Sequence, residues 1–195
     1  MPIRYADDIA ILFERKVDAE RVLRVLPERF GKYGLSLHPD KTRLVPFRRP
    51  DRNNSDDDEP GTFDLLGFTH YWTQSRRGKW IVKQKTAKDR LARTLRRIAE
   101  WCRRNRHLPV ASQQRALSRK LEGHYAYFGI TSNYRALKRV WHQVVALWKK
   151  ALARRSNQGF SWVKMHGLLR QHPLPWPRIR RQYGKQLPLL SSSNT

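Results

Sequence analysis

The chain has 195 residues, of which 39% are hydrophobic and 11% aromatic, and its formal net charge at pH 7 is +25. This hydrophobic content excludes a disordered polycation, and the charge predicts a polyanionic partner, with nucleic acid as the first candidate and a membrane surface as a weaker one. The single cysteine, Cys102, excludes an internal disulfide framework and a multi-cysteine zinc site, and the seven histidines show no metal-ligand spacing. The single cysteine suits a reducing, intracellular compartment. No segment is typical of a membrane span or a signal peptide, and we expect nucleic acid rather than a membrane to be the partner.

The charge is distributed unevenly along the chain. Residues 1–64 have a net charge of −1, whereas residues 65–195 have a net charge of +26. After residue 64 the acidic residues are Asp89, Glu100 and Glu122. This asymmetry predicts one part of the chain with a chemical role and another that binds a polyanion.

The N-terminal segment predicts a strand, a tight turn and a second strand over residues 3–13. The turn sequence is RYADD (residues 4–8), and a β-rich apolar run follows at residues 9–13. Divalent cations prefer carboxylate oxygens, and two-metal sites use such clusters to polarise phosphate, so Asp7 and Asp8 are candidate metal ligands. Asp pairs are also common in turns that bind nothing, and the pair alone leaves both interpretations open.

The rest of the first third predicts one helix, one turn and one strand. An amphipathic helix is expected over residues 18–33, with Asp18 as N-cap, Gly34 as terminator and Pro27 as a kink or interruption. A turn is expected at residues 38–41 and a strand of period two at residues 42–47. Residues 48–61 hold almost nothing apolar and predict a flexible acidic linker, whose consecutive carboxylates would not form a preorganised metal site.

The remainder predicts β structure followed by helices. Strand character resumes at residues 63–68, and residues 71–82 predict a hairpin with a basic tip at residues 75–78. From Thr86 the apolar period becomes helical, and helices are expected over residues 87–106, 112–128, 133–155 and 161–171, with residues 173–177 extended. Such helices with short connections predict a small helical bundle.

Several aromatic residues are assigned from their spacing. Trp141 and Trp148 lie seven residues apart on an apolar helix face, so we expect both in the core, and Tyr125 and Phe128 as well. Trp176 lies among prolines and is the best candidate for an exposed aromatic side chain.

Four motifs follow one another in a fixed order. They are the Tyr-x-Asp-Asp hairpin, GLSL with DKT (residues 34–42), FDLLGF (residues 63–68) and GHYAYFG (residues 123–129). This series resembles the reverse transcriptase/maturase proteins encoded by bacterial group II introns, over nearly the whole chain. The resemblance implies an α+β fold, in which a partial palm of antiparallel hairpins plus one helix precedes an all-α helical-bundle thumb, or domain X.

The resemblance also implies a division of the chain into five segments. They are a partial palm (residues 1–47), the acidic linker (48–61), a primer-grip-like β segment (62–85), the thumb or maturase domain (86–172) and a Pro-rich basic tail (173–195).

The resemblance implies roles for individual residues. Asp7 and Asp8 would bind catalytic Mg²⁺, Tyr5 would pack beside the primer or template, and Lys41 would lie near phosphates. The residues matching the primer grip are Leu66, Gly67 and Phe68. A glycine suits that position, because a missing Cβ lets another backbone come close.

The basic helices suit A-form RNA, which proteins recognise largely through phosphates and shape. The candidate RNA-contact residues share a positive charge and a position in the basic part of the chain after residue 64. They are Arg76, Arg77, Lys79, Lys83, Lys85, Lys88, Arg93, Arg96, Arg97, Arg103, Arg104, Lys138, Arg139, Lys149, Lys150, Arg154 and Arg155.

The chain departs from the family pattern at both ends. The family's fingers and the palm strand with the first catalytic aspartate lie upstream of the hairpin, where this sequence has almost nothing, and no HNH-like endonuclease motif follows the thumb. We therefore expect a fragment that binds intron RNA or other structured RNA, assists splicing in the bacterial cytoplasm and does not polymerise alone. The alternatives are an active or split RNA-directed DNA polymerase that needs an upstream fingers/palm fragment, and a non-catalytic structural RNA-binding protein.

Overall fold

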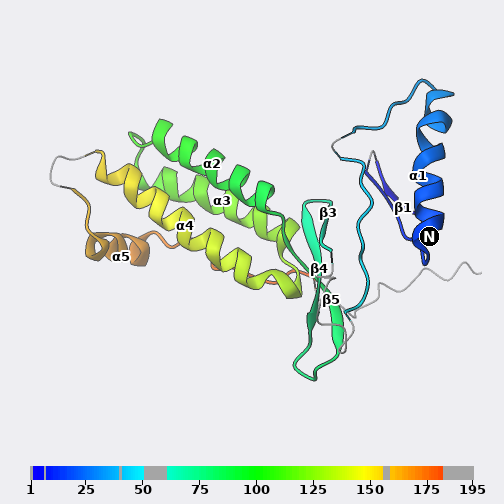
Figure 1. Ribbon diagram of the computed structural model, residues 1–195. Helices are drawn as coiled ribbons and strands as arrows, with labels where there is room; N and C mark the ends of the chain where they lie inside the picture. Colours follow the sequence, from blue (N-terminus) through cyan, green and yellow to red (C-terminus); the bar gives the residue numbers. More distant parts are fainter. Residues whose placement is uncertain (1, 7, 40, 51–60, 156–158, 182–195) are drawn as a thin grey trace, which may run out of the picture. The chain divides into compact units, whose positions relative to one another are not determined.

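The computed structural model describes residues 2–6, 8–39, 41–50, 61–155 and 159–181 (Figure 1). Within these ranges it contains five α-helices and two small antiparallel sheets, which confirms the predicted α+β class. The chain divides into two compact units after Lys83, named here the N-terminal unit and the C-terminal unit. The finer division into five segments stays a prediction.

The N-terminal unit begins with the predicted hairpin. Strand β1 (Pro2–Tyr5) pairs antiparallel with β2 (Asp8–Ile11), and Tyr5 lies opposite Asp8 in the register. Only two residues connect this pair, and the first of them, Ala6, has a φ of +48°. A two-residue loop with a positive φ is typical of hairpin turns whose twist matches that of the strands.

Helix α1 (Lys16–Gly31) begins earlier than predicted. Arg15 is the N-cap residue, and its Nε lies 3.0 Å from the Asp18 carboxylate, so the prediction of Asp18 as N-cap is wrong. An acidic side chain is also favourable within the first turn, where it faces the positive end of the helix dipole. The assigned helix runs through Pro27 without interruption.

Gly34 terminates the helical turns as predicted. Its φ is +67°, its N–H donates to Gly31 O at 3.1 Å, and the N–H of Leu35 donates to Phe30 O at 3.1 Å. These two bonds form the motif in which a left-handed glycine closes a helix.

The segment after α1 contains the predicted turn but not the predicted strand. The N–H groups of Lys41 and Thr42 both donate to His38 O, at 3.2 and 3.0 Å. Residues 42–47 have no strand assignment, so the period-two prediction is wrong there. A strand needs a partner ladder, whereas this segment is held by Pro46 O, which accepts from Gly61 N–H at 2.9 Å. The Phe47 ring packs at 4.9 Å from the Phe63 ring.

The second sheet has the strand order β3 (Phe63–Leu65), β4 (Phe68–Gln74) and β5 (Trp80–Thr86). The β3–β4 turn consists of Leu66 and Gly67, whose φ values are +52° and +76°. The β4–β5 turn is closed by the Ser75 N–H, which donates to Lys79 O at 2.8 Å. The hairpin predicted over residues 71–82 is therefore confirmed, whereas the strand character predicted over residues 63–68 is interrupted by the turn at Leu66 and Gly67.

The C-terminal unit is a helical bundle. Its helices are α2 (Lys88–Arg104), α3 (Val110–Phe128), α4 (Tyr134–Ala153) and α5 (Trp162–Gln171), with the 3₁₀ helix η1 (Thr131–Asn133) before α4. Helix α3 begins two residues before the predicted Ser112, directly after its N-cap residue Pro109. Helices α2, α3 and α4 lie side by side (Figure 1).

The core of the bundle contains two of the four aromatic residues that were predicted there, and the other two lie at its edge. Trp148 is fully buried and Tyr125 is 2% exposed, whereas Trp141 and Phe128 are half-buried at its edge. Within the described residues, no helix is long and apolar enough to cross a membrane.

An extended segment, residues 173–181, crosses the bundle after α5 and is named here the C-terminal strap. Tyr125 Oη donates to Pro175 O at 3.2 Å, and the N–H of Arg180 donates to Gly129 O at 2.7 Å. Leu174 of the strap is 6% exposed and belongs to the core cluster. The strap is thus an integral part of the C-terminal unit.

Candidate functional site

The hairpin turn is the first candidate site. Asp8 is exposed at the start of β2 beside Tyr5, which is 67% exposed. Asp7 lies outside the described residues. Among those that are described, no three His, Cys, Asp or Glu side chains gather as a metal ion would require. Metal binding by Asp7 and Asp8 therefore stays a prediction, and what the structure adds is the tight turn that joins Tyr5 to Asp8.

The predicted primer and nucleotide contacts belong to three different elements of the N-terminal unit. Tyr5 ends β1, Lys41 is exposed in the turn after α1, and the primer-grip residues form the β3–β4 turn and its closing pair. The turn geometry by itself explains a glycine at position 67, because a two-residue turn with two positive φ values favours glycine. Their contact with a primer stays a prediction.

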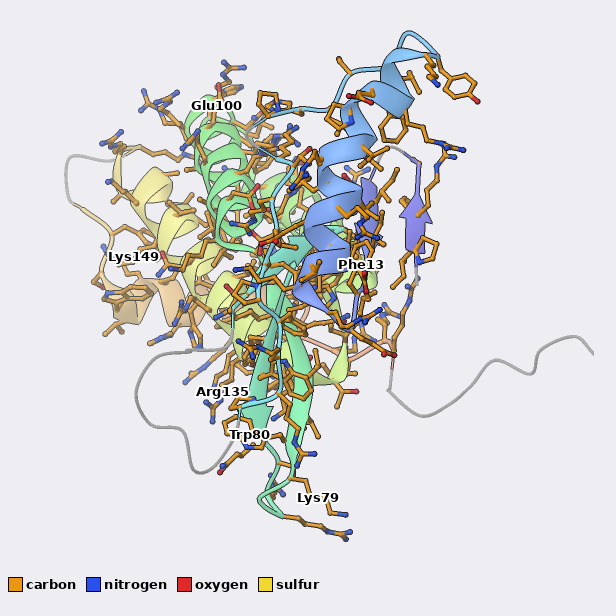
Figure 2. All side chains as sticks on the ribbon, turned by 45° about the vertical axis from the view of Figure 1, so that its right-hand side comes forward. Phe13, Lys79, Trp80, Glu100, Arg135 and Lys149 are labelled. Carbon is orange, nitrogen blue, oxygen red and sulfur yellow. The ribbon has the colours of Figure 1, made fainter. Side chains whose placement is uncertain are left out.

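The basic residues form the second candidate site. Of the predicted RNA contacts, Lys83 and Lys149 are half-buried and all the others are exposed. Lys79 extends from the tip of the β4–β5 hairpin (Figure 2). Helix α2 is amphipathic, because Ile98 and Cys102 are buried on one face while its arginines are exposed. The amphipathic pattern therefore leaves the cationic face of α2 available to a ligand.

An open groove between α2 and α4 gathers part of this charge in one place, and we name it the α2–α4 groove. It encloses about 510 Å³. Its lining residues are Arg96, Ala99, Glu100, Arg103, Arg106, Leu147, Lys150, Ala151 and Arg154. Among them, five are cationic and one is acidic. Because like charges at short range repel one another, such a groove is most stable when an anion occupies it.

Four of the five cations of the groove belong to the predicted contact set. Arg106 was not in that set, and helical spacing could not have located it, because Arg106 follows the end of α2. The acidic Glu100 is already neutralised in part, because its carboxylate forms an ion pair with Arg104 at 2.5 Å. The net charge facing the groove is therefore strongly positive.

Other predicted contacts have partners within the protein. The Arg155 side chain donates to Leu108 O at 3.2 Å, and Lys149 Nζ lies 5.1 Å from the centre of the Trp162 ring. Arg93 lies 3.8 Å from the Asp89 carboxylate. These interactions restrain each side chain, and the groove cations are stronger candidates for phosphate contacts.

Burial shifts the pKa values of several titratable groups inside the C-terminal unit. Burial raises the pKa of the Cys102 thiol to about 11, and burial also raises the pKa of Tyr125. A thiol with a raised pKa holds little thiolate at neutral pH and is a poor nucleophile. The C-terminal unit thus offers a cationic binding surface, and Cys102 serves in packing.

The N-terminal part of the chain is similar to a known family. Residues 2–70 match the family model described as reverse transcriptase (RNA-dependent DNA polymerase). The match spans the β1–β2 hairpin, α1, the following segment, β3 and the first residues of β4. No curated protein matches the chain.

Proposed function

We propose that the chain is a reverse-transcriptase-derived protein that binds structured RNA through its C-terminal unit, in the manner of a group II intron maturase, and that it does not polymerise by itself. The family match at residues 2–70 supports a reverse-transcriptase-type protein. The order of the four motifs and the helical bundle after them support the finer assignment to palm motifs followed by a thumb. On this proposal, the RNA is an intron or another folded RNA.

The observation that carries the proposal is the α2–α4 groove. Two helices and the turn after α2 bring Arg96, Arg103, Arg106, Lys150 and Arg154 to one hollow that holds a single acidic side chain. Guanidinium groups bind phosphate oxygens with two parallel hydrogen bonds, and A-form RNA presents its phosphates as a regular array. A cationic groove of this kind therefore fits a polyphosphate ligand better than it fits an apolar ligand.

The hairpin carboxylates alone do not fit a complete two-metal centre. Nucleotidyl transfer by two metal ions needs further carboxylate ligands and a pocket for the incoming nucleotide. Asp8 has an exposed carboxylate of the right chemistry for Mg²⁺, yet no group of three such side chains is present in the described parts of the chain.

A salt titration tests the proposal directly. The purified chain is titrated against a fluorescent structured RNA at 50 to 200 mM salt, and its affinity is read by anisotropy. If the five groove cations each neutralise a phosphate, the affinity falls by about 10²- to 10³-fold over this range. An affinity that barely changes with salt contradicts the proposal.

The match over residues 2–70 favours one alternative, a split RNA-directed DNA polymerase. Co-expression with an upstream fingers/palm fragment, followed by primer-extension and splicing assays, separates the two. Mg²⁺-dependent extension that appears only with the added fragment favours the alternative. Stimulation of splicing without extension favours the proposal.

A further inference from the structure

The C-terminal strap carries an aromatic side chain that is both exposed and held in place. Trp176 is 46% exposed, yet its indole Nε1 donates a hydrogen bond to Tyr134 Oη at 3.1 Å. The ring centroid of Trp176 lies 4.7 Å from that of Trp141, at an interplanar angle of 63°, and 6.2 Å from that of His142. We name these four residues the aromatic cluster.

Packing of the strap does not explain the exposure of Trp176. Leu174 and Pro177 are the strap residues that are buried against the bundle. Tyr134 is also 38% exposed, so the polar end of the indole is held at the surface rather than within the core. A large aromatic surface that is fixed but left in water is typical of a binding site.

Cations flank the aromatic cluster on both of its segments. Lys138 is exposed one helical turn from Tyr134 and one turn from His142, so it shares their face of α4. Arg178 is exposed two residues after Trp176. Neither α4 nor the strap contains an acidic residue. The site therefore combines an aromatic surface with positive charge, which together suit a nucleotide.

We infer that the aromatic cluster is a stacking site for an unpaired RNA base, with Lys138 and Arg178 beside the flanking phosphates. This inference rests on the proposed RNA binding and adds a feature of the RNA that the groove does not recognise, namely a bulged or looped-out nucleotide. Proteins bind unpaired RNA bases by stacking them on aromatic side chains. Because its hydrogen bond and ring contacts already hold Trp176, little side-chain entropy is lost on stacking.

The inference is tested with two RNA hairpins that differ by a three-nucleotide bulge. The wild-type chain should bind the bulged RNA more tightly. Trp176→Ala should weaken binding of the bulged RNA by about 5- to 100-fold and binding of the fully paired RNA by less than about twofold. Trp176→Phe keeps an aromatic face and should retain most of the preference. The control is Trp162→Ala, because Trp162 is 49% exposed and also lies beside a cation, Lys149.

Two results from the variants overturn the inference. One is an equal loss for both RNAs on Trp176→Ala, which would mean that the indole only fastens the strap. The other is a loss of the preference for the bulged RNA on Trp162→Ala that is as large as the loss on Trp176→Ala.

A measurement on the wild-type chain keeps the test independent of how the variants fold. A 2-aminopurine base in the bulge should lose fluorescence when it stacks on the protein, and unchanged fluorescence at saturation overturns the inference. Binding of both RNAs with equal affinity overturns this inference alone. Binding of neither RNA overturns the proposed function as well.

Discussion

Asn133 and Thr86 exchange two hydrogen bonds across 47 residues of sequence. The backbone N–H of Thr86 donates to Asn133 Oδ1 at 2.8 Å, and Asn133 Nδ2 donates to Thr86 Oγ1 at 2.7 Å and to Phe128 O at 2.9 Å. Ser132 adds a bond from its hydroxyl to Gln84 O at 2.6 Å. These contacts join the end of β5 to the start of α4, and so tie the first residues of the C-terminal unit to its bundle.

Replacement of Asn133 should therefore destabilise the C-terminal unit. Asn133 is 1% exposed, and Asn133→Ala leaves the buried groups of Thr86 and Phe128 without this partner. An unsatisfied buried polar group costs about 1–3 kcal/mol, so we expect a loss of about 3 kcal/mol in the free energy of unfolding, measured by urea denaturation. Gln143→Ala on the exposed face of α4 is the control, with an expected change within about 0.5 kcal/mol. A similar loss in both variants would contradict the role given to Asn133.

The same contact shows where prediction from the sequence succeeded and where it stopped. Asn133 was predicted to begin a helix, and α4 does begin at Tyr134, because capping preference and apolar period are local signals. The Asn133 side chain makes no capping hydrogen bond to α4, because it is hydrogen-bonded to Thr86 instead. A partner so distant in sequence leaves no local pattern. The strand predicted over residues 42–47 was wrong for a related reason. Alternation of apolar and polar residues favours a strand, but it does not show whether a neighbouring strand is there to pair with it.

The candidate binding site divides in the same way. The polar faces of α2 and α4 follow from their periodicity, so most of the basic residues were correctly predicted to be exposed. Which of them converge depends on how α2 packs against α4, and that packing brings Arg96 and Arg154 to one groove. Arg106 was missed because it follows the end of α2 and its place depends on the turn.

Gly129 and Gly123 make opposite predictions for the same substitution. A Cβ on Gly129 would lie 2.8 Å from Arg178 O in the strap and in contact with Tyr125 O, whereas a Cβ on Gly123 would meet nothing within 4 Å. Gly129→Ala should therefore lower the free energy of unfolding and expose the strap amides to hydrogen exchange. Gly123→Ala should raise the free energy of unfolding by about 0.5–1 kcal/mol, because alanine is the better helix former. Equal exchange of the strap amides in the two variants would argue against close packing at Gly129.

His124 should make the stability of the C-terminal unit depend on pH. Burial lowers its pKa from 6.5 to about 4, and its Nε2 finds no hydrogen-bond partner within the described part of the chain. Between these two pH values the unfolded chain binds more protons than the folded one. The contribution of the buried, neutral His124 to the free energy of unfolding is therefore fully present above about pH 6.5. The free energy of unfolding falls as the pH drops from 6.5 towards 4.

Denaturation with urea at several pH values measures this effect. His124→Gln should flatten the dependence in that window, whereas replacement of the exposed His107 by Gln should leave it unchanged. A steep dependence that persists in His124→Gln would assign it to other groups.

The α2–α4 groove predicts that the position of a charge matters more than its number. The double variant Arg103→Gln with Arg154→Gln removes two groove cations, and the control, Arg119→Gln with Arg170→Gln, removes two exposed cations from α3 and α5. Each lost phosphate contact lowers the slope of log affinity against log salt by about 1. The groove variant should lose about 2 in slope and the control close to none. Equal losses would show that the RNA senses only the total charge.

The last prediction concerns the hairpin carboxylates and tests whether they take part in RNA binding or in catalysis. Asp7→Asn with Asp8→Asn changes the charge by two, as the groove variant does, but within residues 1–64, where the net charge is −1. This double variant leaves every cation of the α2–α4 groove in place, so we expect the RNA affinity to stay within about twofold of the wild type. Anisotropy with and without Mg²⁺ measures this. Primer extension assayed in parallel should be absent from both the wild type and the variant, because two carboxylates do not complete a two-metal centre. Extension by the wild type that disappears in the variant would show instead that the hairpin is catalytically active, and would require further carboxylates to reach it.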